Sequence, residues 1–193
     1  VAFAAKQALS FEQGMADVRA VMQGVSEKDF ARLTATAKMM GATTSFTATQ
    51  AAEGLQQLAL AGFDADQSID ALGGVLSAAA ADSIDLGTAA SIISSAVRAF
   101  GLEAKQASKV ADVLALTSAR TSTDIISLGE ALKFVAPISR GLGVDVADTS
   151  LALGLLANAG LKGTVGGTSL KNMLLKLAKP TEKTKEEFNR LGI

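Results

Sequence analysis

Four aspartates mark the places where this sequence could carry acid–base chemistry. Asp64, Asp85, Asp124 and Asp145 recur along the chain, and pairs of carboxylates act as general acid and base in many hydrolases. Each of these aspartates, however, stands just before a run of helix-favouring residues. An aspartate at that position is typical of a helix N-cap, where it also interacts favourably with the helix dipole. We therefore predict that these carboxylates cap helices and that the chain has no catalytic residues.

The residue types that enzymes use most are missing. The 193 residues include no histidine and no cysteine, which removes the commonest general base, the thiolate nucleophile and the usual transition-metal ligands. The glycine-rich stretch LKGTVGGTSLK, residues 161–171, resembles a phosphate-binding loop only in composition, because a P-loop needs a glycine directly before Lys-Ser/Thr and a strand before the loop. The sequence therefore predicts a protein that is not an enzyme and that has no cofactor, no metal site and no small-molecule substrate.

Basic residues gather near the C-terminal end of the sequence. The formal net charge is -1, but residues 161–193 carry 7 basic and 3 acidic side chains. A run of this kind most often forms a solvated helical face. Nucleic-acid binding is the alternative, although no aromatic residues interleave with the lysines to stack on bases. The residues of this possible basic contact face are Lys162, Lys171, Lys176, Lys179, Lys183 and Lys185.

The hydrophobic pattern has the period of an α-helix along the whole chain, and no strand-like alternation stands out. One example of a helical stripe is Leu86, Ala90, Ile93, Val97 and Phe100. Capping patterns predict helix starts at Ser26, Thr47, Asp64 and Thr184, each with a polar partner three residues later. No uncharged stretch reaches the ~20 apolar residues that a membrane span requires.

Glycines followed by an apolar residue predict where helices end. These helix-end glycines are Gly62, Gly101, Gly141 and Gly160, and a left-handed glycine with an apolar successor is typical of the Schellman motif. The first three recur at intervals of 39 and 40 residues. Pro137 is expected to kink or end its helix, because proline lacks an amide donor and clashes with the preceding turn.

Together these signals predict an all-α fold of about 9–10 helices, an irregular bundle built from tandem helical hairpins. Residues 1–46 hold N-terminal helices, residues 47–163 hold three hairpins in tandem, and residues 164–193 hold basic C-terminal helices. We expect one compact domain, a fragment of a longer protein. Alanine is abundant and the aromatic residues are eight phenylalanines, so the core should be thin and the helices should approach closely. The apolar LALGLLANAG helix, residues 151–160, could be internal or could face another chain.

Several segments resemble the core domain of phage tail tape measure proteins in both order and spacing. The most specific are LALAGFDADQSIDAL, GEALKFVAP and LLANAGLKGTVGGTSL, and the resemblance runs from about Phe11 to Ile193. It implies a structural protein of the virion tail, assembled in the host cytoplasm. Family members act as a ruler around which tail-tube subunits polymerise, and they contribute to genome delivery. The family offers no catalytic residues in this region to carry over.

The helix breaks in this segment conflict with its own use as a ruler, because a length measure needs a continuous helix. We therefore expect a folded assembly or anchoring domain that contacts tail-tube and baseplate or hub proteins, and that self-associates in the virion as a trimer or hexamer. A helical-repeat adaptor that binds other proteins, or a module that contacts nucleic acid in the tail lumen, are the alternatives.

Overall fold

The computed structural model describes the backbone of residues 2–192, and their side chains except those of residues 2–5 and 183. Within these residues the chain is all-α, as the sequence predicts, with ten α-helices, one short 3₁₀ helix and no strand. The helices are α1 (Ala2–Val21), α2 (Glu27–Thr43), α3 (Ala48–Leu60), α4 (Ala65–Asp82), α5 (Leu86–Phe100), η1 (Ala104–Gln106), α6 (Ala107–Arg120), α7 (Ile125–Gly141), α8 (Val146–Asn158), α9 (Gly163–Ala178) and α10 (Glu182–Leu191).

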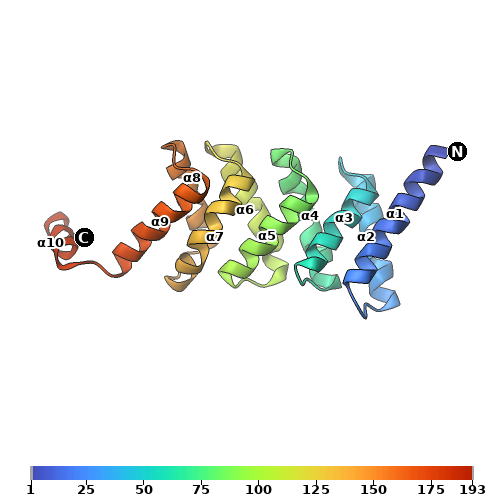
Figure 1. The fold of residues 1–193 in the computed structure, drawn as a ribbon, viewed down its shortest axis with the longest axis horizontal. Coiled ribbons are helices and arrows are strands. Elements are labelled where there is room, and N and C mark those ends of the chain that lie inside the picture. The colour runs from blue at the N-terminus through green and yellow to red at the C-terminus, as the bar shows by residue number, and fades with distance from the viewer. Residues whose placement is uncertain (1, 193) are drawn as a thin grey trace.

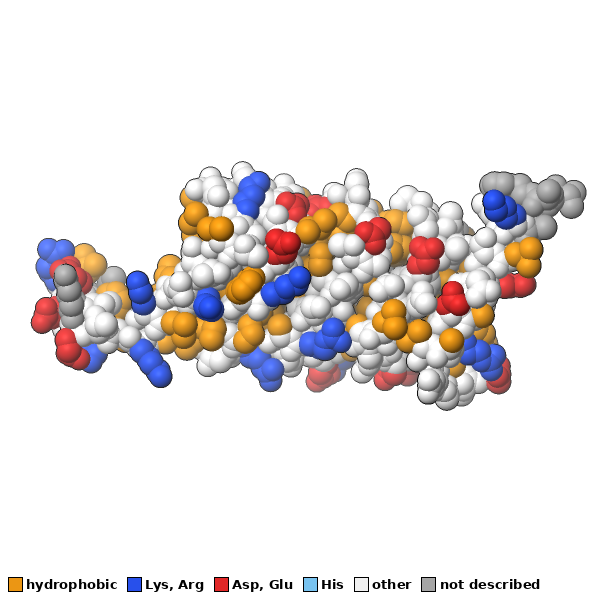
Figure 2. All heavy atoms as spheres, viewed as in Figure 1, with side chains coloured by type: hydrophobic (Ala, Val, Ile, Leu, Met, Phe, Trp, Pro, Cys, Tyr) orange, Lys and Arg blue, Asp and Glu red, His pale blue; other side chains and the backbone are white. Residues whose placement is uncertain are grey.

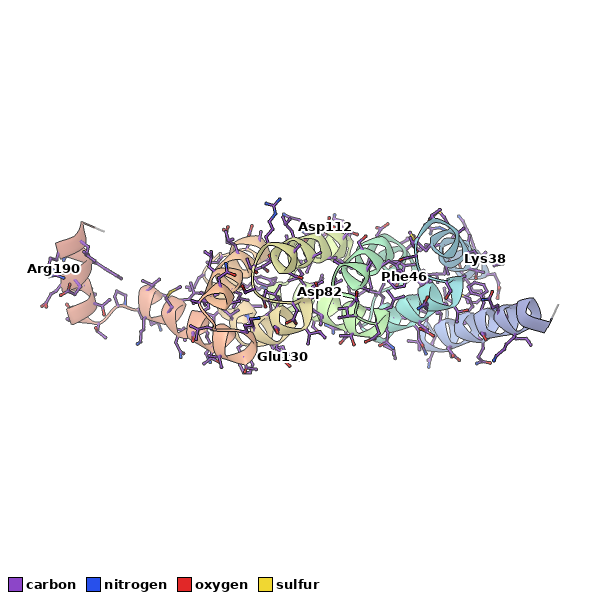
Figure 3. The ribbon with its side chains drawn as sticks, turned by 90° about the horizontal axis from the view of Figure 1, so that it is seen from above. Lys38, Phe46, Asp82, Asp112, Glu130 and Arg190 are labelled. Carbon is purple, nitrogen blue, oxygen red and sulfur yellow. The ribbon has the colours of Figure 1, made fainter. Side chains whose placement is uncertain are left out.

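The first nine α-helices stack in two layers (Figures 1 and 3). Layer A contains α1, α3, α5, α7 and α9, each packed against the next in that order, and layer B contains α2, α4, α6 and α8 in the same way. Each hairpin contributes one helix to each layer, as in α-helical repeat proteins, whose units contact mainly their neighbours. The tandem hairpins expected over residues 47–163 correspond to the pairs α3–α4, α5–α6 and α7–α8.

Polar side chains begin most of these helices. Asp64, Asp85, Asp124 and Asp145 each accept a hydrogen bond from the backbone amide three residues later, at 2.7–2.9 Å. Thr47 and Asp64 form complete capping boxes with Gln50 and Gln67. The last helix differs from the sequence prediction, because Thr181 rather than Thr184 is its N-cap. The helix α9 begins at Gly163, one residue before the C-terminal helical region that the sequence suggested.

Left-handed glycines end the layer A helices at the turns between paired helices. Gly62 and Gly101 have φ of 87° and 65°, and the following residues donate to the carbonyls of Leu58 and Val97, which completes a Schellman motif at each corner. The third corner differs in detail from the prediction. Gly141 is the last residue of α7, whereas the left-handed residue is Gly143, with φ of 76°.

Pro137 does not end its helix, which continues to Gly141. Proline removes one amide donor from a helix interior, and here its ring lies on an exposed side of α7. Helix α8 ends at a further Schellman corner, where Gly160 has φ of 88° and the amide of Leu161 donates to the carbonyl of Leu156.

The core lies between the two layers and consists mainly of leucine, alanine and valine. Within each layer, glycines let neighbouring helices approach closely. At Gly167 of α9, an added Cβ would lie 2.3 Å from the carbonyl oxygen of Ala131 in α7, and at Gly74 of α4 it would lie 2.7 Å from Cα of Ser108 in α6. The close packing of helices through small residues that the composition suggests is therefore present. No helix within residues 2–192 is long and apolar enough to cross a membrane.

Candidate interaction surfaces

A groove between α5 and α7 opens on the outer side of layer A. Two adjoining hollows of about 450 and 200 Å³ share Ser91, Ile92, Gly129 and Lys133 as lining residues. The groove lies where small side chains of α5, such as Ser91 and Ser95, meet Gly129 of α7. Ile92 of α5 partly fills the space beside Gly129, because a Cβ added to Gly129 would lie 2.9 Å from Ile92 Cγ2. Ser91 and Ser95 lie one turn apart on the same side of α5 and keep that side small.

The charges around this groove are of both signs. Glu130 and Lys133 of α7 lie along one wall, and Asp85 lies at one end. The Thr88 hydroxyl and the Thr88 backbone amide both donate hydrogen bonds to the Asp85 carboxylate. These bonds, the one from the hydroxyl more strongly, lower the pKa of Asp85 below its ordinary value. On the layer A face as a whole, acidic and basic side chains are interspersed with apolar ones (Figure 2). This mixed surface favours contact with another protein over binding to a polyanion.

A larger hollow, of about 610 Å³, lies where the α1–α2 turn meets the corner between α3 and α4. Its two carboxylates already have partners within the chain. Asp29 accepts hydrogen bonds from Ser26 and Arg32, and Asp64 accepts one from the amide of Gln67. The hollow therefore presents carboxylates that stabilise helix starts. Among the residues that the structure describes, no group of acidic side chains is arranged to hold a metal ion.

Comparison with known proteins shows which family this stack of hairpins belongs to. A family profile of phage-related minor tail proteins matches residues 34–193, from the middle of α2 to beyond α10. A tape measure protein of Pneumococcus phage Dp-1 is 37% identical over 183 residues, which cover 95% of this chain. The chain belongs to the phage minor tail protein family. The resemblance to tape measure proteins that the sequence suggests is thereby confirmed.

This tail protein segment spans only part of such a relative. The aligned residues make up 16% of the Dp-1 tape measure protein, so the activity and contacts of a whole tape measure protein are not those of this segment by default. No solved structure matches the chain. The two-layer stack of hairpins therefore has to be understood from its own geometry.

The six lysines of the possible basic contact face do not share one side of the tail protein segment. Lys162 precedes α9 and Lys179 follows it, while Lys171 and Lys176 lie five residues apart within it and so point to different sides of the helix. Lys185 on α10 forms an ion pair with Glu182 at 2.7 Å. The side chain of Lys183 lies outside the described residues. The lysines that can be placed thus form a scattered set rather than a stripe.

Several polar residues that link the hairpins of this tail protein were missed by the sequence analysis. The carboxylate of Asp82, at the end of α4, accepts hydrogen bonds from the Ser118 hydroxyl of α6 and from the Ile125 amide at the start of α7. At the end of α8, Asn158 accepts a hydrogen bond of 2.7 Å from the amide of Ser122. These partners lie 36–43 residues apart, so no local pattern indicates them.

Two arginines also contact the preceding hairpin. Arg98 of α5 donates to the carbonyl of Ala61 at the end of α3, and the guanidinium of Arg140 in α7 lies against Gly101 at the end of α5. Both arginines precede a left-handed corner glycine by three residues, because Arg98 precedes Gly101 and Arg140 precedes Gly143. A basic side chain near a helix C-terminus interacts favourably with free carbonyls and the helix dipole, and in both hairpins the arginine lies at the corner of the preceding hairpin.

Proposed function

We propose that this segment is a folded, non-enzymatic assembly or anchoring domain of a tape measure protein. In this role it contacts other tail proteins, and sequence elsewhere in the protein measures tail length. The family membership supports a tail protein, and the two-layer stack of hairpins is the observation that supports a contact domain rather than a ruler. The segment acts in the virion tail, and the tail is assembled in the host cytoplasm.

The stacking makes this segment inefficient as a measure of length. A continuous helix rises ~1.5 Å per residue, so ~39 residues would extend ~58 Å. The same number of residues folded as one hairpin advances the stack by only one helix spacing, which is about 10 Å. The same number of residues therefore spans about one sixth of the distance in this stack that it would span in a single helix. A folded block of this kind suits an anchoring role, from which tail assembly and genome delivery can be organised.

The groove between α5 and α7 is the contact surface that we assign to this function, and the partner that we expect is a tail-tube, baseplate or hub protein. The groove has short side chains, a partly exposed apolar wall and both signs of charge, as surfaces that bind proteins commonly do. A trimer or hexamer in the virion is consistent with tail symmetry. Nothing in the placement of the lysines favours nucleic acid as the partner, since they do not follow a common face.

The proposal is tested by binding assays with separately purified tail-tube, distal-tail and hub proteins. Cross-linking followed by mass spectrometry should locate one specific partner at α5 and α7. The substitution Ser91→Arg places a long side chain in the groove and should weaken that binding at least tenfold. The matched control is Ser77→Arg, at an exposed serine in α4 of layer B, which should leave binding unchanged. Equal effects of the two substitutions would show that the groove is not the binding surface. Failure of all three proteins to bind would contradict the contact role itself.

A further inference from the structure

Helix α10 is amphipathic but lies apart from the rest of the chain (Figure 1). Thr184, Phe188 and Leu191 follow one another at intervals of four and three residues, so they line one side of the helix. The opposite side carries charged residues such as Glu186 and Arg190. Within residues 2–192, α10 makes no extended contact with another helix. A helix of 10 residues is too short to be stable in water through its own propensity, since isolated helices shorter than about 12 residues are marginal. It therefore needs a surface to pack against.

The order of the two layers indicates where that surface is. In the pairs α3–α4, α5–α6 and α7–α8, a layer A helix is followed by a layer B helix that packs beside the previous layer B helix. The linkers at residues 61–64 and 142–145 span four residues, and the linker at residues 179–181, between α9 and α10, spans three. Helix α9 belongs to layer A because it packs against α7. The next place in layer B, beside α8, is open.

Apolar side chains surround this open place. Gly166 of α9 faces α8, because an added Cβ would lie 4.0 Å from Cδ2 of Leu153. Met173 and Leu177 lie two and three turns further along the same side of α9, and their exposed fractions are 47% and 50%. On α8, Ala152 and Leu156 are only partly buried. Leu170, on the same side of α9 but nearer its start, is 2% exposed, so the exposure on this side begins beyond Leu170.

We propose that α10 folds back about the Lys179–Pro180 linker and occupies the layer B place beside α8, with Phe188 and Leu191 against Met173 and Leu177. Its charged side then faces water. The structure holds α10 in the undocked arrangement, and the docked arrangement completes a fourth hairpin, α9–α10. This inference concerns the fold alone and does not depend on the proposed function.

Distances between two spin labels test the docking directly. The chain contains no cysteine, so the double variant Asp148→Cys and Glu187→Cys carries labels only on α8 and α10. Both positions are exposed. Neighbouring helices lie 8–10 Å apart, so docking should give a main distance within about 25 Å by double electron–electron resonance. A distribution centred far above that value in a monomeric sample would overturn the proposal.

Two substitutions and a matched control show which side chains hold the helix. Phe188→Glu and Leu177→Glu should each remove the short distance, because they place a charge in the apolar contact. Leu175→Glu should preserve it. Leu175 is also an exposed leucine of α9, at 42%, but it lies two residues from Leu177 and therefore on nearly the opposite side of the helix. The main stack should still melt as one cooperative unit in all three variants, measured by circular dichroism, because each residue is exposed or lies outside that stack. Helical content should fall in Phe188→Glu and Leu177→Glu by no more than the 10 residues of α10.

Docking onto a second copy is a separate outcome that would also overturn the proposal. Chains labelled only at Asp148→Cys, mixed with chains labelled only at Glu187→Cys, give the short distance only if α10 of one copy packs on α8 of another. Docking within one chain predicts no signal from this mixture and a short distance in the double variant that persists on dilution.

Discussion

At the scale of single residues, Asp82 connects three helices with one carboxylate. It accepts hydrogen bonds from the Ser118 hydroxyl and from the Ile125 amide, which is one of the amides at the start of α7 that have no partner within their own helix. The side chain is partly buried, so its loss would leave these donors without an acceptor in a place that water reaches poorly. Figure 3 shows Asp82 between the two layers, whereas Asp112 lies at the outer edge of layer B.

The substitution Asp82→Ala should therefore lower the free energy of unfolding by about 1–3 kcal/mol, the range for a partly buried donor left unsatisfied. Urea denaturation monitored by circular dichroism measures the difference. Asp112→Ala is the matched control, because Asp112 is exposed in α6, and it should change stability by less than about 0.5 kcal/mol. Equal effects from the two substitutions would show that Asp82 does not link the hairpins.

Gly141 and Gly143 give a second test at this scale. Gly143 has φ of 76°, a left-handed backbone that costs an alanine about 1–2 kcal/mol. Gly141 is the last residue of α7, and an added Cβ there would meet no atom within 4 Å, so alanine there should stabilise the chain by about 0.4–1 kcal/mol. We expect Gly143→Ala to lower the melting temperature and Gly141→Ala to raise it. If Gly141→Ala instead lowered the melting temperature and Gly143→Ala raised it, the left-handed residue would be Gly141, as the sequence alone suggested.

At the scale of helices, the starts marked by an aspartate are the boundaries that the sequence predicts best. An aspartate before an apolar helical stripe has one physical role, and Asp64, Asp85 and Asp124 all perform it. The end of α7 is ambiguous in sequence, because Gly141 and Gly143 are both followed by an apolar residue. The expectation that Pro137 could end its helix was wrong, and the kink stays a prediction. A proline in a helix removes one hydrogen bond, and the packing of α7 between α5 and α9 outweighs that loss.

The groove between α5 and α7 could not be predicted, since it depends on contacts between hairpins. Gly129 and Ile92 are 37 residues apart in sequence, and only the stacking of layer A brings them together. The lysines of the possible basic contact face stay a prediction as a contact site. Their closeness in sequence suggested a common face, but the helical rotation within α9 and the break before α10 separate them.

The N-cap of α5 provides a prediction that depends on pH. Asp85→Ala should lower the free energy of unfolding by about 1 kcal/mol at pH 7. The pKa of Asp85 is lowered in the folded state by its hydrogen bonds to Thr88. The charged form therefore contributes stability that is complete above the unfolded pKa, near 3.9, and is lost as the pH falls through the lower folded value. The difference between wild type and Asp85→Ala should shrink below about pH 4.

Asp85→Asn is the control for this titration, because asparagine is also a good N-cap but does not ionise in this range. Its stability relative to Asp85→Ala should stay constant between pH 7 and pH 3, measured by urea unfolding at each pH. If the difference between wild type and Asp85→Ala does not change with pH, the charge of Asp85 has no role in the cap.

At the scale of the whole molecule, the two layers convert tandem hairpins into a stack that grows by one helix spacing per hairpin. Links such as Arg98 to Ala61 and Asp82 to Ile125 join each hairpin to another, and the core continues between the layers without a break. Such stacks tolerate added units, because each unit contacts mainly its neighbours. This property separates a contact domain from a ruler, since a duplicated hairpin adds many residues but little length.

The most direct test of the account is therefore the length of phage tails assembled with a tape measure protein in which residues 85–123 are duplicated. This insertion adds one complete α5–α6 hairpin. We expect tails of unchanged length by electron microscopy, because the insertion extends a folded block by only about 10 Å and leaves the measuring sequence intact. Tails that lengthen by ~58 Å, the rise of ~39 residues in a continuous helix, would show that this segment itself measures the tail.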